Sequence, residues 1–219
     1  MSTNNAMINR SEAPPASLAP TKTTSARPVK ILLYRWAGKW GPFKVNIPCG
    51  ECTITGDIIR DTIENELAGI PVVLETRDWL SHWWRAMLKG GWHAPVVMVD
   101  GKVIAQGAAL NRGVLAEQVV KAWVARSGMV GNHVFGKDRC GHCVRAKEML
   151  DFYGIPFAYH DVVKNPRAVY EMVPRAKAEI GEKTPVTTPQ IWLDGRYVGG
   201  ADALEGWLRQ KPSEARAAA

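Results

Sequence analysis

The fold of this chain can be read from ten residues, Val134-Phe135-Gly136-Lys137-Asp138-Arg139-Cys140-Gly141-His142-Cys143. They join a short apolar run, typical of a buried strand, to two cysteines separated by two residues. A second pair, Cys49-Gly50-Glu51-Cys52, lies 91 residues earlier and accounts for the other two of the four cysteines. Pairs of this kind indicate redox or metal chemistry rather than the disulfide scaffold of a small secreted domain.

The sequence around the two pairs is repeated. Sliding one half over the other by 94 residues places Pro95 on Pro189 and Asp100-Gly101 on Asp194-Gly195. Hydrophobic periodicity and turn residues predict the order strand-helix-strand-helix-strand-strand-helix in both halves. In the first half, we expect strands at 31–36, 70–74, 94–99 and 102–106 and helices at 53–67, 78–89 and 112–127. In the second half, we expect strands at 132–135, 157–161, 189–193 and 196–198 and helices at 140–153, 165–180 and 201–210.

This order predicts an α/β protein of two tandem domains, 30–127 and 128–211, each with a central mixed sheet flanked by helices. The 219 residues, 46% of them hydrophobic, are enough for two cores. Residues 1–29 are rich in Ser, Thr, Ala and Pro, so we predict that they are disordered, with a flexible tail at 212–219.

The formal net charge is +7, but Lys and Arg are scattered rather than clustered. We therefore predict neither a nucleic-acid partner nor a membrane partner, although positive potential can attract an anionic thiol. The first residues lack the apolar core of a secretory signal, so a cytoplasmic location is expected, with an organellar transit peptide as the alternative.

A cysteine at a helix N-terminus is suited to attack disulfides. The helix dipole and free N–H groups lower its pKa, and the thiolate is the attacking species. Lys137, Arg139 and His142 add positive charge around Cys140, which we predict to be the nucleophile, with Cys143 as the resolving cysteine. A buried inert pair, half of a zinc site, and iron–sulfur chemistry are the alternatives.

Three motifs in order resemble the glutaredoxin family. Val134–Cys143 is similar to its strand-Lys-x-x-Cys-Pro-Tyr-Cys start, and Thr187-Thr188-Pro189-Gln190-Ile191 resembles its Thr-Val-Pro-x-Ile. The third, Gly199-Gly200-Ala201-Asp202-Ala203-Leu204, resembles Gly-Gly-x-(Ser/Asp)-Asp-Leu. The resemblance spans 131–208 and implies a thioredoxin-like fold of the glutaredoxin type.

The resemblance also implies a site for glutathione as co-substrate. Pro189 would be a cis proline facing the dithiol, and the Thr188 backbone would pair with the glutathione backbone. Lys137 would contact the glycine carboxylate, and the Gly199-Gly200 turn and Asp202 would hold the γ-glutamyl end. A solvated lysine, a purely structural turn, and a helix N-cap role for Asp202 are the alternatives.

The second half departs from the family at two places. Gly141 and His142 replace the common Pro and Tyr, which gives the Cys-Gly-His-Cys of protein disulfide isomerases. A histidine here should disfavour the disulfide and stabilise the thiolate. The segment 163–185 is longer than in a minimal glutaredoxin.

The first half resembles a thioredoxin fold that has diverged. Ala105, Gln106 and Ala108 stand where the second half has Gly199, Gly200 and Asp202, so we expect no glutathione site. Glu51 should raise the pKa of the neighbouring thiols. We predict that Cys49 and Cys52 are a second redox-active pair, with a vestigial or structural pair and a metal pair as alternatives.

A cluster of tryptophans occupies the predicted second helix of the first half and the loop after it. Trp79 and Trp83 share one helix face, and Trp92 follows in the loop. The pattern predicts core packing and a domain interface for Trp79, Trp83, Trp84 and Trp92, with a partner site as the alternative.

The predicted function is that of a glutaredoxin-like thiol–disulfide oxidoreductase that reduces protein or glutathione mixed disulfides by a dithiol mechanism. Its expected partners are glutathione and disulfide-bearing client proteins, and no metal is expected. Two alternatives stay open: a relay of electrons between the two cysteine pairs, and a non-enzymatic module that binds an iron–sulfur cluster or a client. The sequence leaves the oligomeric state open.

Overall fold

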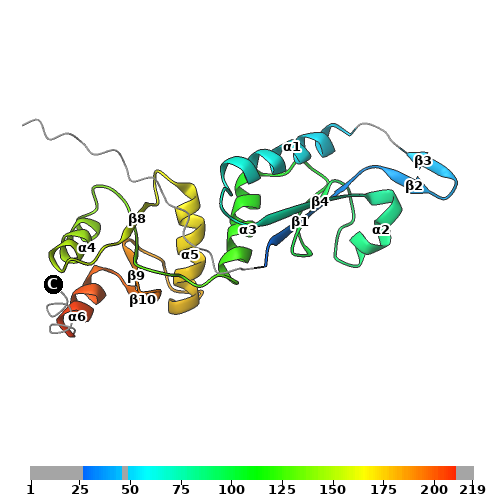
Figure 1. The fold of residues 1–219 in the computed structure, drawn as a ribbon. Coiled ribbons are helices and arrows are strands. Elements are labelled where there is room, and N and C mark those ends of the chain that lie inside the picture. The colour runs from blue at the N-terminus through cyan, green and yellow to red at the C-terminus, as the bar shows by residue number, and fades with distance from the viewer. Residues whose placement is uncertain (1–26, 46–48, 211–219) are drawn as a thin grey trace, which may run out of the picture.

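The computed structural model describes residues 27–45 and 49–210. It contains two α/β units in succession along the chain, which meet at helices α3 (Arg112–Val124) and α5 (Pro166–Ile180) (Figure 1). The segments predicted to be disordered lie outside the described residues except at 27–29. The prediction is wrong at Val29, which is fully buried and begins the first strand. Within the described ranges, no helix combines the length and the apolar character needed to cross a bilayer.

The first unit holds a four-stranded sheet in the order β4-β1-β5-β6. Strand β1 runs parallel to β4, with Val29 opposite Val72, and antiparallel to β5. Its elements are β1 (Val29–Arg35), β2 (Gly38–Trp40), β3 (Phe43–Val45), α1 (Gly50–Asn65), β4 (Val72–Asp78), α2 (Trp79–Met87), β5 (Val96–Val99), β6 (Lys102–Gln106) and α3.

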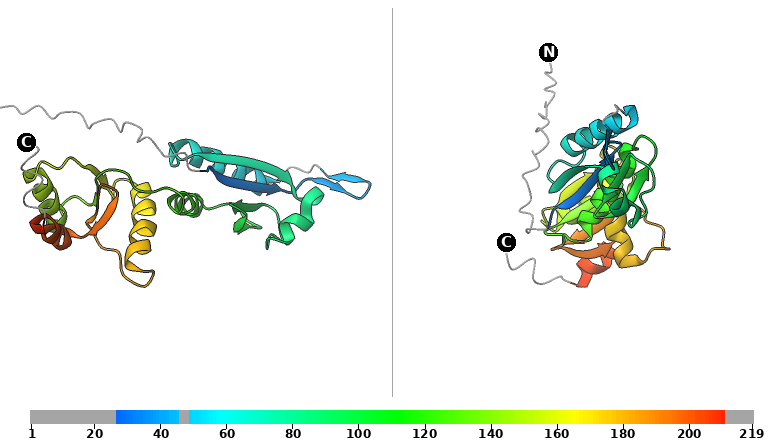
Figure 2. Two further views of the ribbon diagram at one scale, coloured as in Figure 1. Left: turned by 60° about the horizontal axis from the view of Figure 1, so that its bottom comes forward. Right: turned by 90° about the vertical axis from the view of Figure 1, so that its right-hand side faces the viewer.

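The second unit repeats this arrangement. Its sheet has the equivalent order β8-β7-β9-β10, again with the first two strands parallel. The elements are β7 (His133–Gly136), α4 (Gly141–Phe152), β8 (Ala158–Asp161), α5, β9 (Gln190–Leu193), β10 (Arg196–Gly199) and α6 (Ala201–Gln210). The predicted order of elements is confirmed in the second half and, apart from the added hairpin β2–β3, in the first. Figure 2 shows the two units from two further directions.

Two Asp-Gly turns join the last two strands of each sheet. Asp100 and Gly101 have φ of 51° and 85°, and Asp194 and Gly195 have φ of 50° and 76°. Two successive residues with positive φ make the turn that matches the twist of a β-hairpin. Gly195 is required for a further reason, because a Cβ there would lie 2.4 Å from the carbonyl oxygen of Met129.

The central strands of each sheet are buried on both faces, which explains their nearly continuous apolar sequences. In β1, Ile31 and Leu33 pack under α1 and α3, whereas Leu32 and Tyr34 pack on the opposite face with Ala86 of α2. The same alternation divides β7, where Val134 faces α4 and α6 and Phe135 faces α5.

Helices α3 and α5 pack against each other where the two units meet, and Arg175 lies at the centre of this contact. Its side chain is buried and pairs with Glu171 at 3.0 Å. The same guanidinium donates to the carbonyl oxygen of Ser127 at 2.9 Å and lies 5.3 Å from the centre of the Trp123 ring. The long segment 163–185 thus supplies the helix that packs against the first unit.

The interpretation of the tryptophan cluster as core and domain interface is wrong for most of its members. Trp83, Trp84 and Trp92 are 37%, 48% and 62% exposed, and only Trp79 is half-buried. The tryptophan that lies at the contact between the units is Trp123. Helical spacing placed Trp79 and Trp83 on one helix face, but it did not show that Trp83 would stay exposed.

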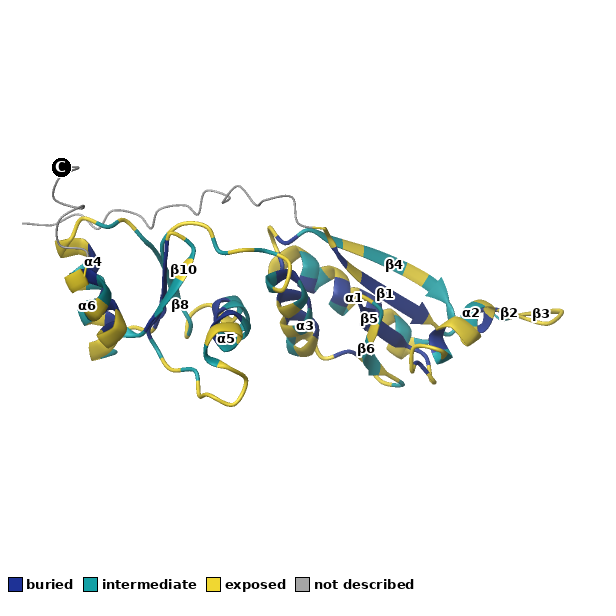
Figure 3. Cartoon of the chain, turned by 90° about the horizontal axis from the view of Figure 1, so that it is seen from below, coloured by how far each residue is buried: buried dark blue, intermediate teal, exposed yellow. Residues whose placement is uncertain are grey.

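The β2–β3 hairpin was not predicted, since 37–48 reads as a loop. Gly41, with φ of 57°, and Pro42 form its two-residue turn, and the strands on either side are only three residues long. Trp40 packs on Trp83 at 5.8 Å between ring centres, and Phe43 is 70% exposed. Figure 3 shows the hairpin as an exposed arm at the end of the first unit.

A buried histidine should make the second unit sensitive to acid. His160 in β8 lies between the rings of Phe135 and His133, at 4.5 and 5.2 Å, and its Nε2 is 2.9 Å from Nδ1 of His133. Burial lowers the pKa of His160 to about 4 from its ordinary value of 6.5. Between about pH 4 and pH 6.5, His160 is therefore protonated in the unfolded chain but neutral in the folded protein, so stability is lost as pH falls through this range.

The expected loss on going from pH 7 to pH 4 is at most about 3 kcal/mol from this residue. Urea unfolding at several pH values measures it, comparing His160→Gln with the exposed control His93→Gln. The pH dependence should flatten in His160→Gln alone. An unchanged slope in that variant would show that another group is responsible.

Candidate functional site

Both cysteine pairs occupy the same position in their units, at the start of a helix. Cys49 and Cys140 are the N-caps of α1 and α4, with nearly equal backbone angles of φ −107°, ψ 112° and φ −104°, ψ 115°. An extended backbone at this position leaves the side chain beside the free N–H groups of the first turn. The Cys49 sulfur accepts such a bond from the N–H of Cys52 at 3.4 Å. All four cysteines are free thiols.

The second cysteine of each pair interacts with the residue that follows the first strand. The N–H of Trp36, after β1, donates to the sulfur of Cys52 at 3.3 Å. The N–H of Lys137, after β7, interacts in the same way with the sulfur of Cys143, which is fully buried. Lys137 therefore contributes its backbone to the dithiol, a role that its side-chain chemistry does not predict.

The pKa of Cys140 is lowered from its ordinary value, as expected for an attacking thiol. The largest cause is the Cys143 thiol, followed by the N–H of Cys143, and the Thr188 hydroxyl and the N–H of His142 also contribute. Hydrogen-bond donors directed at the sulfur favour the thiolate over the thiol, which is why they lower the pKa. The leading causes are thus hydrogen-bond donors, not the cationic side chains on which the sequence prediction relied.

Burial acts in the opposite direction on the second cysteines. It raises the pKa of Cys143, and it raises the pKa of Cys52 to about 11, with a further increase from the hydrogen bond with Cys49. Glu51 also raises the pKa of Cys52, in the predicted direction, as a minor cause. A buried thiol of high pKa is a poor attacking group but can serve as the resolving thiol.

The structure brings Thr188, Pro189 and Gly200 together beside Cys140. The Thr188–Pro189 peptide is cis, the Thr188 hydroxyl interacts with the Cys140 sulfur, and a Cβ on Gly200 would lie 3.7 Å from the Pro189 carbonyl oxygen. The equivalent Ala94–Pro95 peptide in the first unit is also cis. The Lys137 side chain is exposed.

Gly199 lies in a β-bulge that both units share. The register of β10 on β9 shifts between Tyr197 and Gly199, and the register of β6 on β5 shifts between Val103 and Ala105. Gly199 has a φ of 108°, a conformation that side-chain-bearing residues rarely adopt. The first unit has Ala105 at the equivalent position, so its loop differs where the second unit has the glycine turn.

Asp202 is not an N-cap, which excludes that alternative. It is the second residue of α6, and the position before the helix is Gly200. Its carboxylate is 84% exposed and forms an ion pair with Arg145 of α4. Arg145 was not singled out in the sequence because only the fold brings α4 and α6 together.

Tyr159 is a further residue at the dithiol that sequence reasoning missed. A Cβ built on Gly136 would lie 3.1 Å from the Cys143 sulfur and 3.3 Å from the Tyr159 hydroxyl, so both groups flank the same glycine. That hydroxyl is buried, and within the described part of the chain it has no hydrogen-bond partner. Burial raises the pKa of Tyr159 to about 12.

Replacing Tyr159 by phenylalanine should stabilise the protein by about 1 kcal/mol, because it removes a buried hydroxyl that has no partner. Tyr197→Phe is the matched control, since the Tyr197 hydroxyl donates to Gln190 at 2.5 Å and its loss should destabilise by about 1 kcal/mol. Urea unfolding free energies measure both. Destabilisation by Tyr159→Phe would mean that the hydroxyl is satisfied in solution.

The first dithiol borders a pocket of about 330 Å³ between α1 and the strands β1 and β4. Its lining includes both cysteines and two cations, Arg35 and Arg60, each paired with an aspartate. Trp36, in the place of Lys137, stacks on Trp79 at 5.5 Å between ring centres. The surroundings of the two dithiols therefore differ in both charge and shape.

Within residues 27–45 and 49–210, no group of three or more His, Cys, Asp or Glu side chains is placed to hold a metal ion. The zinc alternative needs all four cysteines together. In the structure each pair begins a helix of a different unit, and α3 and α5 lie between those units (Figures 1 and 2).

The second unit matches known proteins. The family model for glutaredoxin matches residues 133–198. Glutaredoxin 3 of Escherichia coli is 30% identical over 76 residues, which cover 35% of this chain and 83% of the relative. Glutaredoxin 4 of Pasteurella multocida is 37% identical over 71 residues, and here the match covers 32% of this chain and 59% of the relative.

Among solved structures, the buckwheat glutaredoxin–glutathione complex is similar, with 21% identity, a TM-score of 0.35, and coverage of 45% of this chain and 84% of that one. The sequence relatives establish the assignment, since E. coli glutaredoxin 3 is covered over most of its length. Through its second unit, this chain belongs to the glutaredoxin family.

Proposed function

We propose that this protein is a glutathione-dependent thiol–disulfide oxidoreductase with Cys140 as its nucleophile. One observation supports this most directly: Cys140 is partly exposed, has a lowered pKa, and lies beside Thr188 and the cis Pro189. Its neighbour Cys143 is fully buried with a raised pKa. The pair is thus divided into an attacking thiol and a resolving thiol.

With a glutathione mixed disulfide, the Cys140 thiolate attacks the glutathione sulfur. The client–glutathione bond breaks, a Cys140–glutathione disulfide forms, and the client leaves as a thiolate that takes up a proton. A second glutathione thiolate then attacks, which restores the Cys140 thiolate and forms oxidised glutathione. With a protein disulfide, Cys143 loses its proton and resolves the mixed disulfide, and two glutathiones later reduce the Cys140–Cys143 disulfide.

We place glutathione in the groove bounded by these same elements. The Thr188 backbone would pair with the peptide backbone of glutathione, and Lys137 would hold its glycine carboxylate. The Gly199-Gly200 turn would bind the γ-glutamyl carboxylate through its N–H groups, and Asp202 its amino group. Because Asp202 pairs with Arg145 in the free protein, the ligand would share or displace that ion pair.

The first unit is, in this proposal, a divergent thioredoxin-like unit without a glutathione site. Trp36 replaces the lysine, Ala94 the threonine and Ala105 the glycine of the bulge. Its dithiol would be a second redox pair in which Cys52, with its pKa raised to about 11, is the resolving thiol. A reducing compartment such as the cytoplasm would keep all four thiols free.

The test is the turnover of a glutathionylated peptide, coupled to glutathione reductase. The Cys49→Ser/Cys52→Ser variant should keep its rate within about three-fold, whereas Cys140→Ser/Cys143→Ser should lose roughly a hundred-fold or more. If the first double variant loses activity and the second keeps it, the assignment of the site is wrong. Loss in both would instead support a relay between the pairs.

A further inference from the structure

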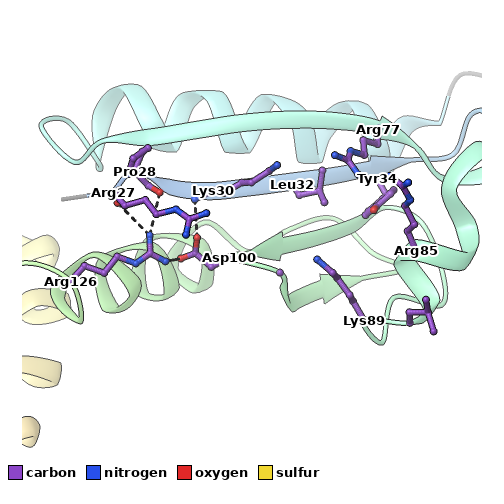
Figure 4. A pocket seen from close by; sticks show the side chains of 12 residues that line it. Arg27, Pro28, Lys30, Leu32, Tyr34, Arg77, Arg85, Lys89, Asp100 and Arg126 are labelled. Carbon is purple, nitrogen blue, oxygen red and sulfur yellow. Dashed lines mark hydrogen bonds and ion pairs between the residues drawn. The ribbon is translucent and has the colours of Figure 1, made fainter. Parts of the chain in front are cut away.

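A second concave site lies on the first unit, away from both dithiols. It is a pocket of about 530 Å³ on the face of the sheet opposite α1, and none of its lining residues is a cysteine. Figure 4 shows its wall of β1 residues, with Arg77 from β4 and Arg85 from α2 at one end and Arg126 at the other. The volume is typical of small-molecule sites.

The pocket exists because α2 is short. On the equivalent face of the second sheet, the 15 residues of α5 cover Phe135 and Trp192. In the first unit the nine residues of α2 cover only part of that face, and its core there is small. The buried side chains of Leu32 and Tyr34 form a floor that the helix leaves open.

One end of the opening is fixed by hydrogen bonds. Arg126 donates to the carbonyl oxygen of Pro28 at 3.2 Å and forms an ion pair with Asp100, which also accepts from the N–H of Lys30 at 3.1 Å. Lys89 extends toward the turn that follows Asp100, since its Nζ would lie 3.2 Å from a Cβ on Gly101. The bonds of Arg126 and Asp100 hold this end of the opening in place without a ligand.

The lining is strongly cationic. It contains one carboxylate, Asp100, and six cations: Arg27, Lys30, Arg77, Arg85, Lys89 and Arg126. Asp100 pairs with Arg126, and Glu75 serves both Lys30 and Arg77. Within the described part of the chain, the side chains of Arg27, Arg85 and Lys89 have no carboxylate partner. Among the residues that the structure describes, about four positive charges therefore converge without a compensating carboxylate.

We infer that this pocket binds the polyphosphate group of a small molecule. Each phosphate brings up to about two negative charges, so two or three linked phosphates supply the missing charge within the available volume. Arginine side chains can bind two phosphate oxygens at once, and two arginines line one end of the pocket, Arg77 on β4 and Arg85 on α2. Lys89 follows just after α2. A ligand that carries carboxylates instead would need about four of them in the same volume to supply this charge, because each brings one negative charge.

The recessed shape of the pocket favours a small ligand over larger polyanions. Nucleic acid and anionic membranes require a cationic stripe or a protruding face, whereas these cations converge over a recessed floor. Free polyphosphate and a nucleoside polyphosphate offer the same chemistry. The site is independent of the dithiols and of the function proposed for them.

Isothermal titration calorimetry of the full chain at physiological salt tests the inference, with tripolyphosphate as the probe. Tripolyphosphate should bind at least roughly ten-fold tighter than orthophosphate, because charge in contact with several cations adds up. Arg85→Gln/Lys89→Gln should weaken this binding about ten-fold. The control Arg196→Gln/Lys183→Gln removes the same charge from the exposed surface of the second unit and should change binding less than about two-fold.

A gain-of-affinity variant guards against simple misfolding. Leu88 lines the pocket and is 80% exposed, so Leu88→Lys should tighten tripolyphosphate binding by roughly two- to five-fold. ATP as a second probe distinguishes free polyphosphate from a nucleoside polyphosphate. If ATP binds as tightly as tripolyphosphate, the pocket recognises the phosphates alone, and if ATP binds more tightly, the pocket also contacts the nucleoside. The inference is overturned if tripolyphosphate fails to bind, if the control pair loses as much affinity, or if only RNA or anionic vesicles bind.

Discussion

Replacing Cys140 by serine is expected to lower the turnover of a glutathionylated peptide by a factor on the order of 10³. The serine hydroxyl stays protonated near neutral pH and is a far weaker nucleophile than the thiolate that the surrounding donors stabilise. Serine is also a favourable N-cap residue, so α4 should begin as before and the folded protein should be retained. The loss is therefore one of chemistry rather than of stability.

Cys143→Ser is the informative partner of this variant. Its hydroxyl can still accept the Lys137 N–H, and glutathione can resolve the Cys140 mixed disulfide without it. Turnover of the glutathionylated peptide should stay within roughly ten-fold, whereas reduction of a protein disulfide, which needs the second thiol, should fall much further. Equal losses on both substrates would contradict the division into attacking and resolving thiols.

The second large effect concerns stability. Arg175→Ala should lower the unfolding free energy by about 3 kcal/mol or more, because Glu171 is left half-buried without its partner and the Ser127 carbonyl oxygen loses its donor. The stacking on Trp123 is lost as well. Urea unfolding measures the loss, and limited proteolysis of the connection at 125–132 reports whether the two units loosen.

Arg209→Ala is the matched control. Arg209 pairs with Glu205 at 2.5 Å with the same four-residue helical spacing, but its side chain is 76% exposed, so the cost should stay below about 0.5 kcal/mol. A double variant, Arg175→Met/Glu171→Gln, removes both charges together and should recover most of the stability. If Arg175→Ala behaves like Arg209→Ala, the buried contact does not hold the units together.

The order of the elements could be predicted because it depends on local signals. Alternation of apolar residues marked the strands, and the Asp-Gly dipeptides marked both hairpins, so β6 (102–106) and α6 (201–210) were placed correctly. The β2–β3 hairpin was missed because three-residue strands carry no recognisable period. The exposed Trp83 and Trp84 were misassigned because periodicity identifies an apolar face but not whether another element covers it.

The site was predicted in part. The sequence identified Cys140, Thr188 and Pro189 by their motifs, and the fold brings them together. Sequence could not identify the donors that lower the Cys140 pKa, because backbone N–H groups belong to every residue type. Tyr159 and Arg145 were missed because only tertiary packing brings them to the dithiol and to Asp202.

The central claim is that the two dithiols are unequal and that Cys140 is the reactive thiol. Alkylation by iodoacetamide between pH 5 and 11, with the rate at each cysteine followed by mass spectrometry, measures this in the unmodified protein. Cys140 should react first, with a midpoint below the ordinary thiol value, while the rate at Cys52 should still be rising near pH 11. Faster modification of Cys49 or Cys52 than of Cys140 at neutral pH would contradict the account.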